Sequence, residues 1–322
     1  EAAGNAGIIN IRLKKNKSLG TNGSVNAGWN IGTYAKYNTG ISLNYRNKKI
    51  NLFGNYSYNQ AKMENKVGIY RTVADSLFDQ SGRIIMNNES HNFKAGLDYF
   101  IDKKNTIGVM VNGNLSNPDF NNKSTTPISY MPTGKVDRIL VADNTSLKIS
   151  NNVNANLNYS YTGKAGKSLQ VNADHGWYDI NSNQLQPNYY YDATGKTLIN
   201  SVVYRMIAPT TININSVKAD WEQPFKKGTL GFGGKYANVK TDNDFQRYNI
   251  NSGLESIDKD RSNLFTYKEN IGAAYVNYSR ALKGITLQAG VRMEHTNAKG
   301  ISTGQKIVAG NYTAYSETFN RS

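Results

Sequence analysis

Apolar and polar residues alternate along much of the chain with a period of two. One such stretch runs from Ile285 to Met293. The clearest lies around residue 156, where the odd positions are Val153, Ala155, Leu157, Tyr159 and Tyr161 and the even positions are Asn152, Asn154, Asn156, Asn158 and Ser160. This period indicates a β-strand with one apolar and one polar face. No segment of comparable length shows the 3.6-residue period of an amphipathic helix. We therefore predict an all-β fold.

Extending this pattern predicts about eleven strands, and most of them are unusually long. Most have nine residues or more, against about 5–6 in a usual strand. A tilted strand needs about 9–11 residues to cross a bilayer. We therefore predict an antiparallel transmembrane β-barrel whose apolar face meets lipid and whose polar face lines the lumen. The predicted strands are 23–30, 34–46, 50–60, 90–102, 105–115, 146–162, 167–181, 211–225, 229–243, 264–282 and 285–296.

The connections between these strands alternate between short and long. Short ones fall at 47–49, 103–104, 163–166, 226–228 and 283–284. Long polar ones fall between them, at about 61–89, 116–145, 182–210 and 244–263. Several structureless loops of this length would be unusual in a compact soluble domain. An outer-membrane barrel has short turns at the periplasmic rim and long loops outside, so this alternation supports the barrel prediction.

Aromatic residues give a further sign of two membrane interfaces. One set lies within about five residues of the short turns: Tyr45, Tyr99, Tyr161, Trp221 and Tyr278. A second set lies toward the opposite ends of strands: Tyr58, Trp177 and Tyr236. Amphipathic rings favour the boundary between lipid and water, so we interpret the two sets as girdles. The alternative is that tyrosine is simply common in strands.

Composition narrows the choice of chemistry. The 322 residues carry a formal charge of +15 and no cysteine, which removes disulfides and thiolate chemistry. Lysines concentrate at the short turns, where lipid phosphates would meet them, so we predict no nucleic-acid partner. The three histidines lie on three separate strands, and no Ser-His-Asp arrangement or pair of carboxylates stands out. We predict no catalytic residues, no metal site and no cofactor, and hence no enzyme.

Five short stretches resemble TonB-dependent outer-membrane receptors, and in particular the related β-barrel proteins of Bacteroidetes. They are Gly4–Lys15 (GNAGIINIRLKK), Gly23–Trp29 (GSVNAGW), Lys240–Phe245 (KTDNDF), Glu269–Tyr275 (ENIGAAY) and Leu287–Glu294 (LQAGVRME). The resemblance implies that residues 1–16 form the last strand of a plug domain and that 17–322 form the N-terminal portion of the barrel. It also implies a Gram-negative outer membrane and a barrel of 22 strands. An odd set of about eleven strands agrees with part of a larger barrel, because bacterial single-chain barrels have even numbers.

The family resemblance implies a function and a set of partners. The chain would be a receptor or transporter component that imports a large nutrient, such as a glycan, a peptide or a siderophore-like compound, with TonB-derived energy. TonB would act through an N-terminal region that this sequence lacks, and a surface lipoprotein and lipopolysaccharide would be further partners. The alternative is a structural or assembly-accessory barrel that does not transport by itself.

One aromatic cluster is the candidate ligand-binding site. Tyr189, Tyr190 and Tyr191 are consecutive and lie in the predicted loop 182–210, far from the short turns. Three consecutive side chains of a strand cannot all face lipid, so at least one should face the lumen or lie in the loop. Tyrosine offers a flat apolar surface with a hydroxyl, which suits glycans, peptides and aromatic ligands. The alternative is that these rings extend the outer girdle.

Overall fold

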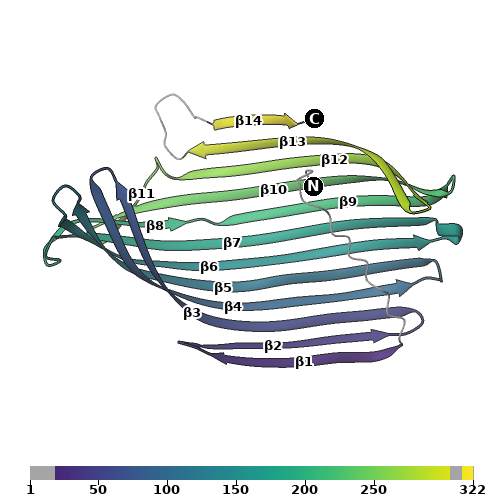
Figure 1. The fold of residues 1–322 in the computed structure, drawn as a ribbon, viewed down its shortest axis with the longest axis horizontal. Coiled ribbons are helices and arrows are strands. Elements are labelled where there is room, and N and C mark those ends of the chain that lie inside the picture. The colour runs from purple at the N-terminus through teal and green to yellow at the C-terminus, as the bar shows by residue number, and fades with distance from the viewer. Residues whose placement is uncertain (1–18, 305–313, 322) are drawn as a thin grey trace.

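The computed structural model describes residues 19–304 and the strand Ala314–Arg321, and it contains a single antiparallel sheet of fourteen strands (Figure 1). The predicted plug strand, residues 1–16, lies outside the described residues. The strands are β1 (Gly20–Ile31), β2 (Ala35–Arg46), β3 (Ile50–Val73), β4 (Ser76–Phe100), β5 (Asn105–Tyr130), β6 (Lys135–Thr162), β7 (Ser168–Asp192), β8 (Leu198–Ile207), β9 (Thr210–Phe225), β10 (Gly228–Asn251), β11 (Leu254–Ile257), β12 (Asn263–Leu282), β13 (Ile285–Gly304) and β14 (Ala314–Arg321).

Each long strand pairs with the next one along the chain, which is the meander expected of a barrel wall. The strands β8 and β9 together act as one strand. Both pair with β7 and with β10, and the register does not shift from Ile207 to Thr210. Pro209 separates them because proline has no N–H to give to the ladder. The only helix among the described residues is one 3-10 turn, Lys164–Gly166, and none there is long and apolar enough to cross a membrane.

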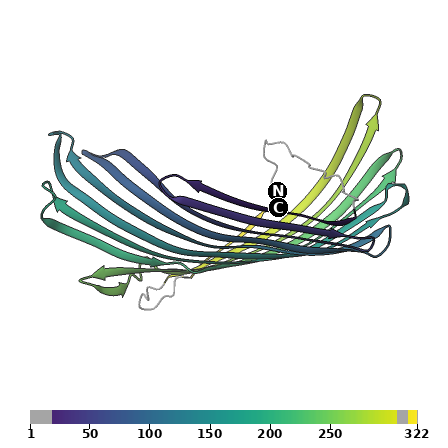
Figure 2. The same ribbon diagram turned by 90° about the horizontal axis from the view of Figure 1, so that it is seen from below.

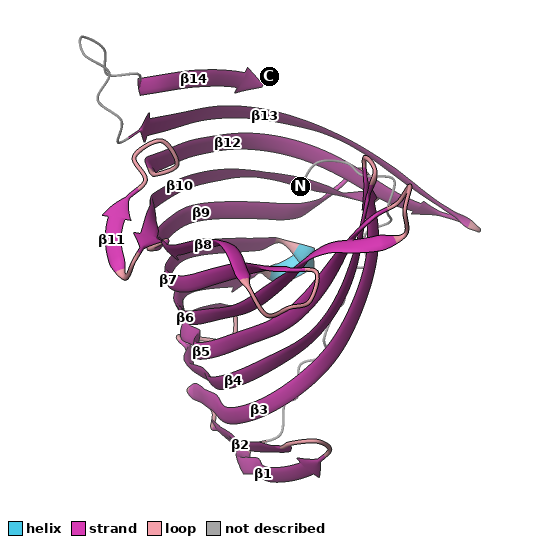
Figure 3. Cartoon of the chain, turned by 90° about the vertical axis from the view of Figure 1, so that its left-hand side faces the viewer, coloured by secondary structure: helices cyan, strands magenta, loops and turns pink. Residues whose placement is uncertain are grey.

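The sheet has almost no core. Among the described residues the buried apolar side chains are only Ile128, Ala142 and Ala237, and no large side chain is fully buried. Figures 2 and 3 show one strongly curved layer with no second layer packed against it. A soluble sheet of this size would bury its apolar face against another layer. This sheet instead leaves that face exposed, with Leu157 at 53% and Val291 at 67%.

The register confirms the predicted sorting of side chains onto two faces. Leu97 pairs with Val109, Val109 pairs with Leu157, and the intervening polar residues point to the opposite side. We call the side of Leu157 the apolar face and the side of Asn156 the polar face. On the polar face, amide and carboxylate side chains bond across strands, as where Asn156 Nδ2 donates to Asp174 Oδ1 at 2.6 Å. The described strands form one sheet, so no dry interior forms between two sheets in this part of the chain.

The short turns lie where the sequence predicts them, and side chains hold them closed. Asn47 Oδ1 accepts from the backbone N–H groups of Lys49 and Ile50, both at 2.8 Å. Asp102 Oδ1 accepts in the same way from Lys104 at 2.6 Å and Asn105 at 2.8 Å. These local bonds satisfy turn amides that the ladder cannot reach. We call this end of the sheet the short-turn end.

The four long connections are not loops, and that prediction was wrong. Most of their residues continue the strands as tall β-hairpins, with turns at 74–75, 131–134, 193–197 and 252–253. In β3 and β4 the pairing runs unbroken from Ile50 and Tyr99 to Val73 and Ser76. Two residues of turn therefore close a ladder of 24 pairs. The count rises from about eleven predicted strands to fourteen because β8, β11 and β14 were not recognised. We call this the long-hairpin end.

Candidate functional site

Aromatic side chains form two rows on the apolar face. Near the short turns, the rings of Tyr161 and Trp221 stack with centroids 6.4 Å apart and planes 17° from parallel. In the same row, Tyr278 donates its hydroxyl to the Lys226 carbonyl at 3.0 Å. The opposite row contains Tyr58, whose ring lies 5.0 Å from that of His91, together with Trp29, Tyr37, Trp177 and Tyr236. About eight residues separate the rows on one strand, which is roughly 26 Å at about 3.3 Å per residue.

The three candidate tyrosines lie in β7, near the tip of the β7–β8 hairpin. Tyr189 pairs with Val141 and Ser201, and Tyr190 pairs with Leu140 and Asn200. Tyr189 and Tyr191 therefore share one side of the hairpin, continuous with the apolar face, while Tyr190 lies on the side of the polar face. All three are half-buried. The expectation that at least one ring leaves the apolar side agrees with this register.

These rings lie far beyond the aromatic row that contains Trp177. Twelve residues of β7 separate Trp177 from Tyr189, which is roughly 40 Å along an extended strand. Membrane girdles sit at the edges of an apolar band about 25 Å tall. Tyr189, Tyr190 and Tyr191 are therefore too distant to extend that girdle.

A second cluster lies beside them on the polar face, where β8 pairs with β10. Tyr204 pairs with Gln186 on one side and with Asn249 on the other. The guanidinium carbon of Arg247 lies 4.1 Å from the centre of the Tyr204 ring, which is a close cation–π contact. Gln186 donates to Gln184 at 3.5 Å and Gln184 donates to Ser182 at 3.1 Å, so a column of amides continues down β7.

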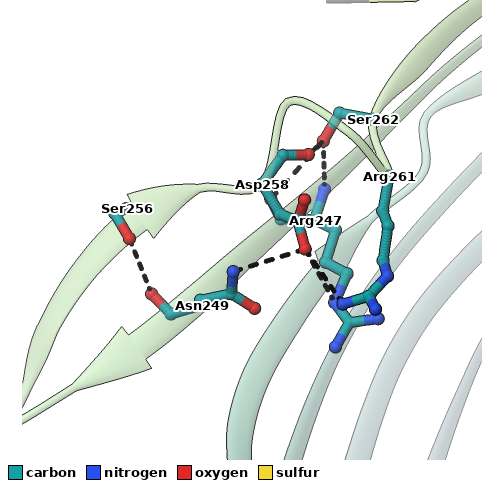
Figure 4. A network of polar contacts seen from close by, with 6 residues as sticks. All are labelled: Arg247, Asn249, Ser256, Asp258, Arg261 and Ser262. Atoms are coloured by element: carbon teal, nitrogen blue, oxygen red, sulfur yellow. Dashed lines mark hydrogen bonds and ion pairs between the residues drawn. The ribbon is translucent and has the colours of Figure 1, made fainter. Parts of the chain in front are cut away.

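Polar contacts join Arg247 to the segment that follows β11 (Figure 4). The Arg247 backbone N–H donates to Ser262 Oγ at 2.9 Å, and Ser262 Oγ donates to the Asp258 carbonyl at 2.7 Å. Ser262 is 2% exposed. Asp258 Oδ2 lies 3.8 Å from Arg247 Nε and 3.3 Å from Arg261 Nη1, and it accepts from Asn249 Nδ2 at 3.3 Å. The network therefore restrains both the backbone and the guanidinium group of Arg247.

The environment of Asp258 keeps it ionised. Partial burial raises the pKa of its carboxyl, but the Asn249 hydrogen bond and the charges of Arg261 and Arg247 outweigh burial and lower that pKa. Asp258 and Arg247 therefore remain oppositely charged at neutral pH. At 3.8 Å the pair is too long for a hydrogen bond, and Arg247 Nε has no hydrogen-bond partner although it is buried. Asn144 Oδ1, on the polar side of β6, is also buried and unpaired.

This arrangement suits binding better than covalent chemistry. A flat ring, a guanidinium and a column of amides offer stacking and directional hydrogen bonds to a polar ligand. Between residues 19 and 304, no group of three or more His, Asp or Glu side chains could hold a metal ion. We call Gln186, Tyr190, Tyr204, Arg247 and Asn144 the hairpin site.

Residues 162–316, a little under half of the chain, match the model of the outer membrane protein beta-barrel family. The match covers β7 to β13 and ends within β14, and β7 to β13 carry part of the exposed apolar face and of both aromatic rows. The chain forms a wall of a bacterial outer-membrane β-barrel. No curated protein matches the sequence. Outer-membrane barrels carry short turns in the periplasm, so the short-turn end is periplasmic and the hairpin site is extracellular.

Of the five residues of this candidate site, only Tyr190 is predicted from the sequence. Tyr190 lies on the same side of β7 as Gln186, four residues and roughly 13 Å further along the strand, whereas Tyr189 and Tyr191 face the other way. Tyr204 and Arg247 have 42 residues between them in the sequence. They meet only because β8 and β10 pair in this register. The run Asp244–Asn251 lies in the predicted loop 244–263 but belongs to β10. Its recurring side-chain ladder, in which Tyr248 donates to Gln246 and Gln246 donates to Asp244, is the signal that it continues a strand.

Proposed function

We propose that this outer-membrane barrel is a receptor or transporter component that imports a large nutrient with TonB-derived energy. The nutrient class is a glycan, a peptide or a siderophore-like compound, and the protein acts without enzymatic chemistry. The polar face supports this proposal. A wall lined by hydrated amides and carboxylates requires water or another polar body in the lumen, because unpaired polar groups are costly in an apolar medium.

The hairpin site carries the proposal. It lies on the polar side of the extracellular hairpins, where an arriving ligand would meet the barrel before the lumen. Arg247 is supported by Asp258 and Ser262, yet its Nε has no hydrogen bond. Asn144 supplies an unpaired acceptor. A buried donor and a buried acceptor without partners are unusual in a folded protein, and a ligand with hydroxyl or amide groups that displaces the surrounding side chains would give both a partner.

The proposed assembly is larger than the described sheet. The sheet order begins at β1 and ends at β14 without closing on itself. In a bilayer, unpaired edge groups are costly, so spanning sheets close. We propose that this sheet, whose path of neighbouring strands is twelve strands wide, belongs to a barrel of 22 strands, with a plug, TonB and a surface lipoprotein as partners.

Two single substitutions, one on each side of the same strand, test the hairpin site. Tyr190→Ser removes the ring on the polar side, and Tyr189→Ser removes its neighbour on the other side of the same strand. Each variant replaces the chromosomal copy, and growth is followed on single nutrient sources: a polysaccharide panel, a peptide digest and ferric siderophores. We expect a gene deletion and a tonB deletion to abolish growth on the same source. Tyr190→Ser should slow uptake of that source at least several-fold, and Tyr189→Ser should leave it unchanged.

The alternative is a structural or assembly-accessory barrel. It predicts that deletion raises sensitivity to detergents on every medium without a source-specific defect, which would overturn the receptor proposal. Equal effects of the two tyrosine substitutions, with the barrel still resistant to heat on gels, would remove the hairpin site from the proposal but leave transport in place.

A further inference from the structure

Three neighbouring strands change character together along the apolar face. The strands β10, β12 and β13 lie side by side (Figure 1), and their residues pair as successive cross-strand rows. From the membrane interior toward the outer surface, the successive rows are Phe232–Val276–Val291, Gly234–Ala274–Met293, Tyr236–Gly272–His295, Asn238–Asn270–Asn297 and Lys240–Lys268–Lys299. The face therefore passes from apolar to aromatic, then to amide, then to cationic. One row of side chains marks each step.

The lysine row places like charges directly opposite one another. Lys240 pairs with Lys268, and Lys268 pairs with Lys299. Neighbouring strands lie about 4.8 Å apart, so the backbones that carry the three lysines span roughly 10 Å. Like charges in directly opposed positions destabilise a sheet. All three side chains are exposed.

Protein carboxylates compensate only one of these charges. Lys240 Nζ lies 2.7 Å from Asp242 Oδ2. Within the described part of the chain, neither Lys268 nor Lys299 forms an ion pair. A second basic row, Lys66–Arg83–Lys123, differs in this respect: Arg83 binds Glu64 through two bonds of 2.8 and 3.0 Å, and Lys123 lies 2.9 Å from Asp143. The lysine row on β10, β12 and β13 therefore retains an unmatched positive charge of about two.

The level of the row relative to the membrane identifies what can neutralise it. Lys240 lies four residues outward from Tyr236 in the outer aromatic row, which is roughly 13 Å along the strand. A strand tilt of about 40° reduces this to roughly 10 Å of height. That height is the headgroup layer, and the side chains point toward lipid and away from the lumen. Between the two rows, Asn270 Oδ1 accepts from Asn238 at 2.9 Å and from Tyr236 at 3.1 Å.

We propose that the Asn238–Asn270–Asn297 and Lys240–Lys268–Lys299 rows form a binding site for the phosphorylated sugar headgroup of lipopolysaccharide. The lysines bind the phosphates, and the asparagines bind the sugar hydroxyls and amides beneath them. The acyl chains then lie along Phe232, Val276 and Val291. This glycolipid is a lateral ligand of the barrel wall, and its site is independent of any nutrient that passes through the lumen.

Charge-neutralising variants test the site with a matched control. The variant Lys240→Gln/Lys268→Gln/Lys299→Gln removes the row. The control Lys48→Gln/Lys49→Gln/Lys103→Gln makes the same change of net charge at the periplasmic turns. The full-length protein, purified in detergent, is titrated with purified lipopolysaccharide, with the same lipid after phosphatase treatment, and with inorganic phosphate. Native mass spectrometry counts bound lipid, and the midpoint of heat unfolding reports stabilisation.

We expect wild type and control to bind phosphorylated lipopolysaccharide and to be stabilised by it. The lysine variant should bind at least about ten-fold more weakly. Without lipid, it should unfold at the same temperature as wild type or higher, because the mutual repulsion is gone. Equal binding by the lysine variant would overturn the site. So would equal binding of the dephosphorylated lipid, and equal stabilisation by inorganic phosphate would reassign the row to a free anion.

Discussion

Placing arginine at two consecutive residues of one strand, one on each face of the sheet, tests the assignment of the two faces. Val111 lies on the apolar face of β5, midway between Ile107 at the lower aromatic row and Leu115, which pairs with His91 at the upper one. Asn112 is the next residue and lies on the polar face. Val111→Arg and Asn112→Arg therefore introduce the same side chain at the same depth, one toward lipid and one toward the lumen.

The expected difference follows from the bilayer midplane. Arginine facing lipid at the midplane of a barrel costs about 2–4 kcal/mol, which is roughly a 30- to 1,000-fold loss in the folding equilibrium constant. At residue 112 the guanidinium reaches a hydrated wall of amides, and we expect less than about 1 kcal/mol. Val111 is 41% exposed in the isolated sheet, so no packed protein core absorbs or hides the change.

Reversible denaturant unfolding in lipid vesicles measures both variants. Tryptophan fluorescence reports the transition because Trp177 and Trp221 lie in the two aromatic rows. The slope of the transition should stay constant, since the surface exposed on unfolding is unchanged. Equal losses for the two variants, or a larger loss for Asn112→Arg, would refute the assignment of lipid and lumen to the two faces.

Three further outcomes are expected. A double-mutant cycle on Tyr161→Ala and Trp221→Ala should give a coupling of about 0.5–1.5 kcal/mol in unfolding free energy, and a zero coupling would mean that the stacked rings do not cooperate. Asn47→Ala should cost about 1–2 kcal/mol by leaving two turn amides without an acceptor, whereas Asn47→Asp, which keeps the acceptor, should cost less. The Thr194 hydroxyl, followed by the backbone N–H groups of the same turn, lowers the Asp192 pKa from 3.8 to about 2. This hydrogen bonding therefore stabilises the 193–197 turn fully above about pH 4, and the stabilisation is lost as pH falls through about 2. Protection of the turn amides against hydrogen exchange, relative to their intrinsic rates, should fall between about pH 5 and pH 2, and unchanged protection would contradict this.

The membrane-spanning part could be predicted from the sequence because lipid acts on every second side chain. Leu157 and Val291 must be apolar to face a bilayer, so the alternation shows directly which residues of each strand face lipid. In the tall hairpins both faces of the ladder meet water, and the alternation has no reason to persist. Segments such as 61–73 and 182–192 are strands with polar residues on both sides, and polarity alone resembles a loop.

The hairpin site could not be derived from local patterns for a related reason. Tyr204 and Arg247 meet because β8 and β10 pair in a particular register. That register is set by the membrane-spanning parts of the same strands and is kept across the interruption at Ala208 and Pro209, where it does not shift. A sequence pattern reports what one strand needs from its environment, and it does not report which rows of two strands align in the hairpins beyond the membrane.

The near absence of a core has a consequence for where this protein can function. The free energy that soluble domains obtain by packing apolar layers must here come from contact with acyl chains, so the membrane is a structural component of the fold. Stability then becomes a joint property of polypeptide and lipid. Each ångström of mismatch between the apolar band and the hydrocarbon thickness costs a fraction of a kcal/mol. Because the rows of neighbouring strands are locked in register, the whole wall experiences that mismatch at once, and the thickness of the host bilayer selects where the barrel is stable.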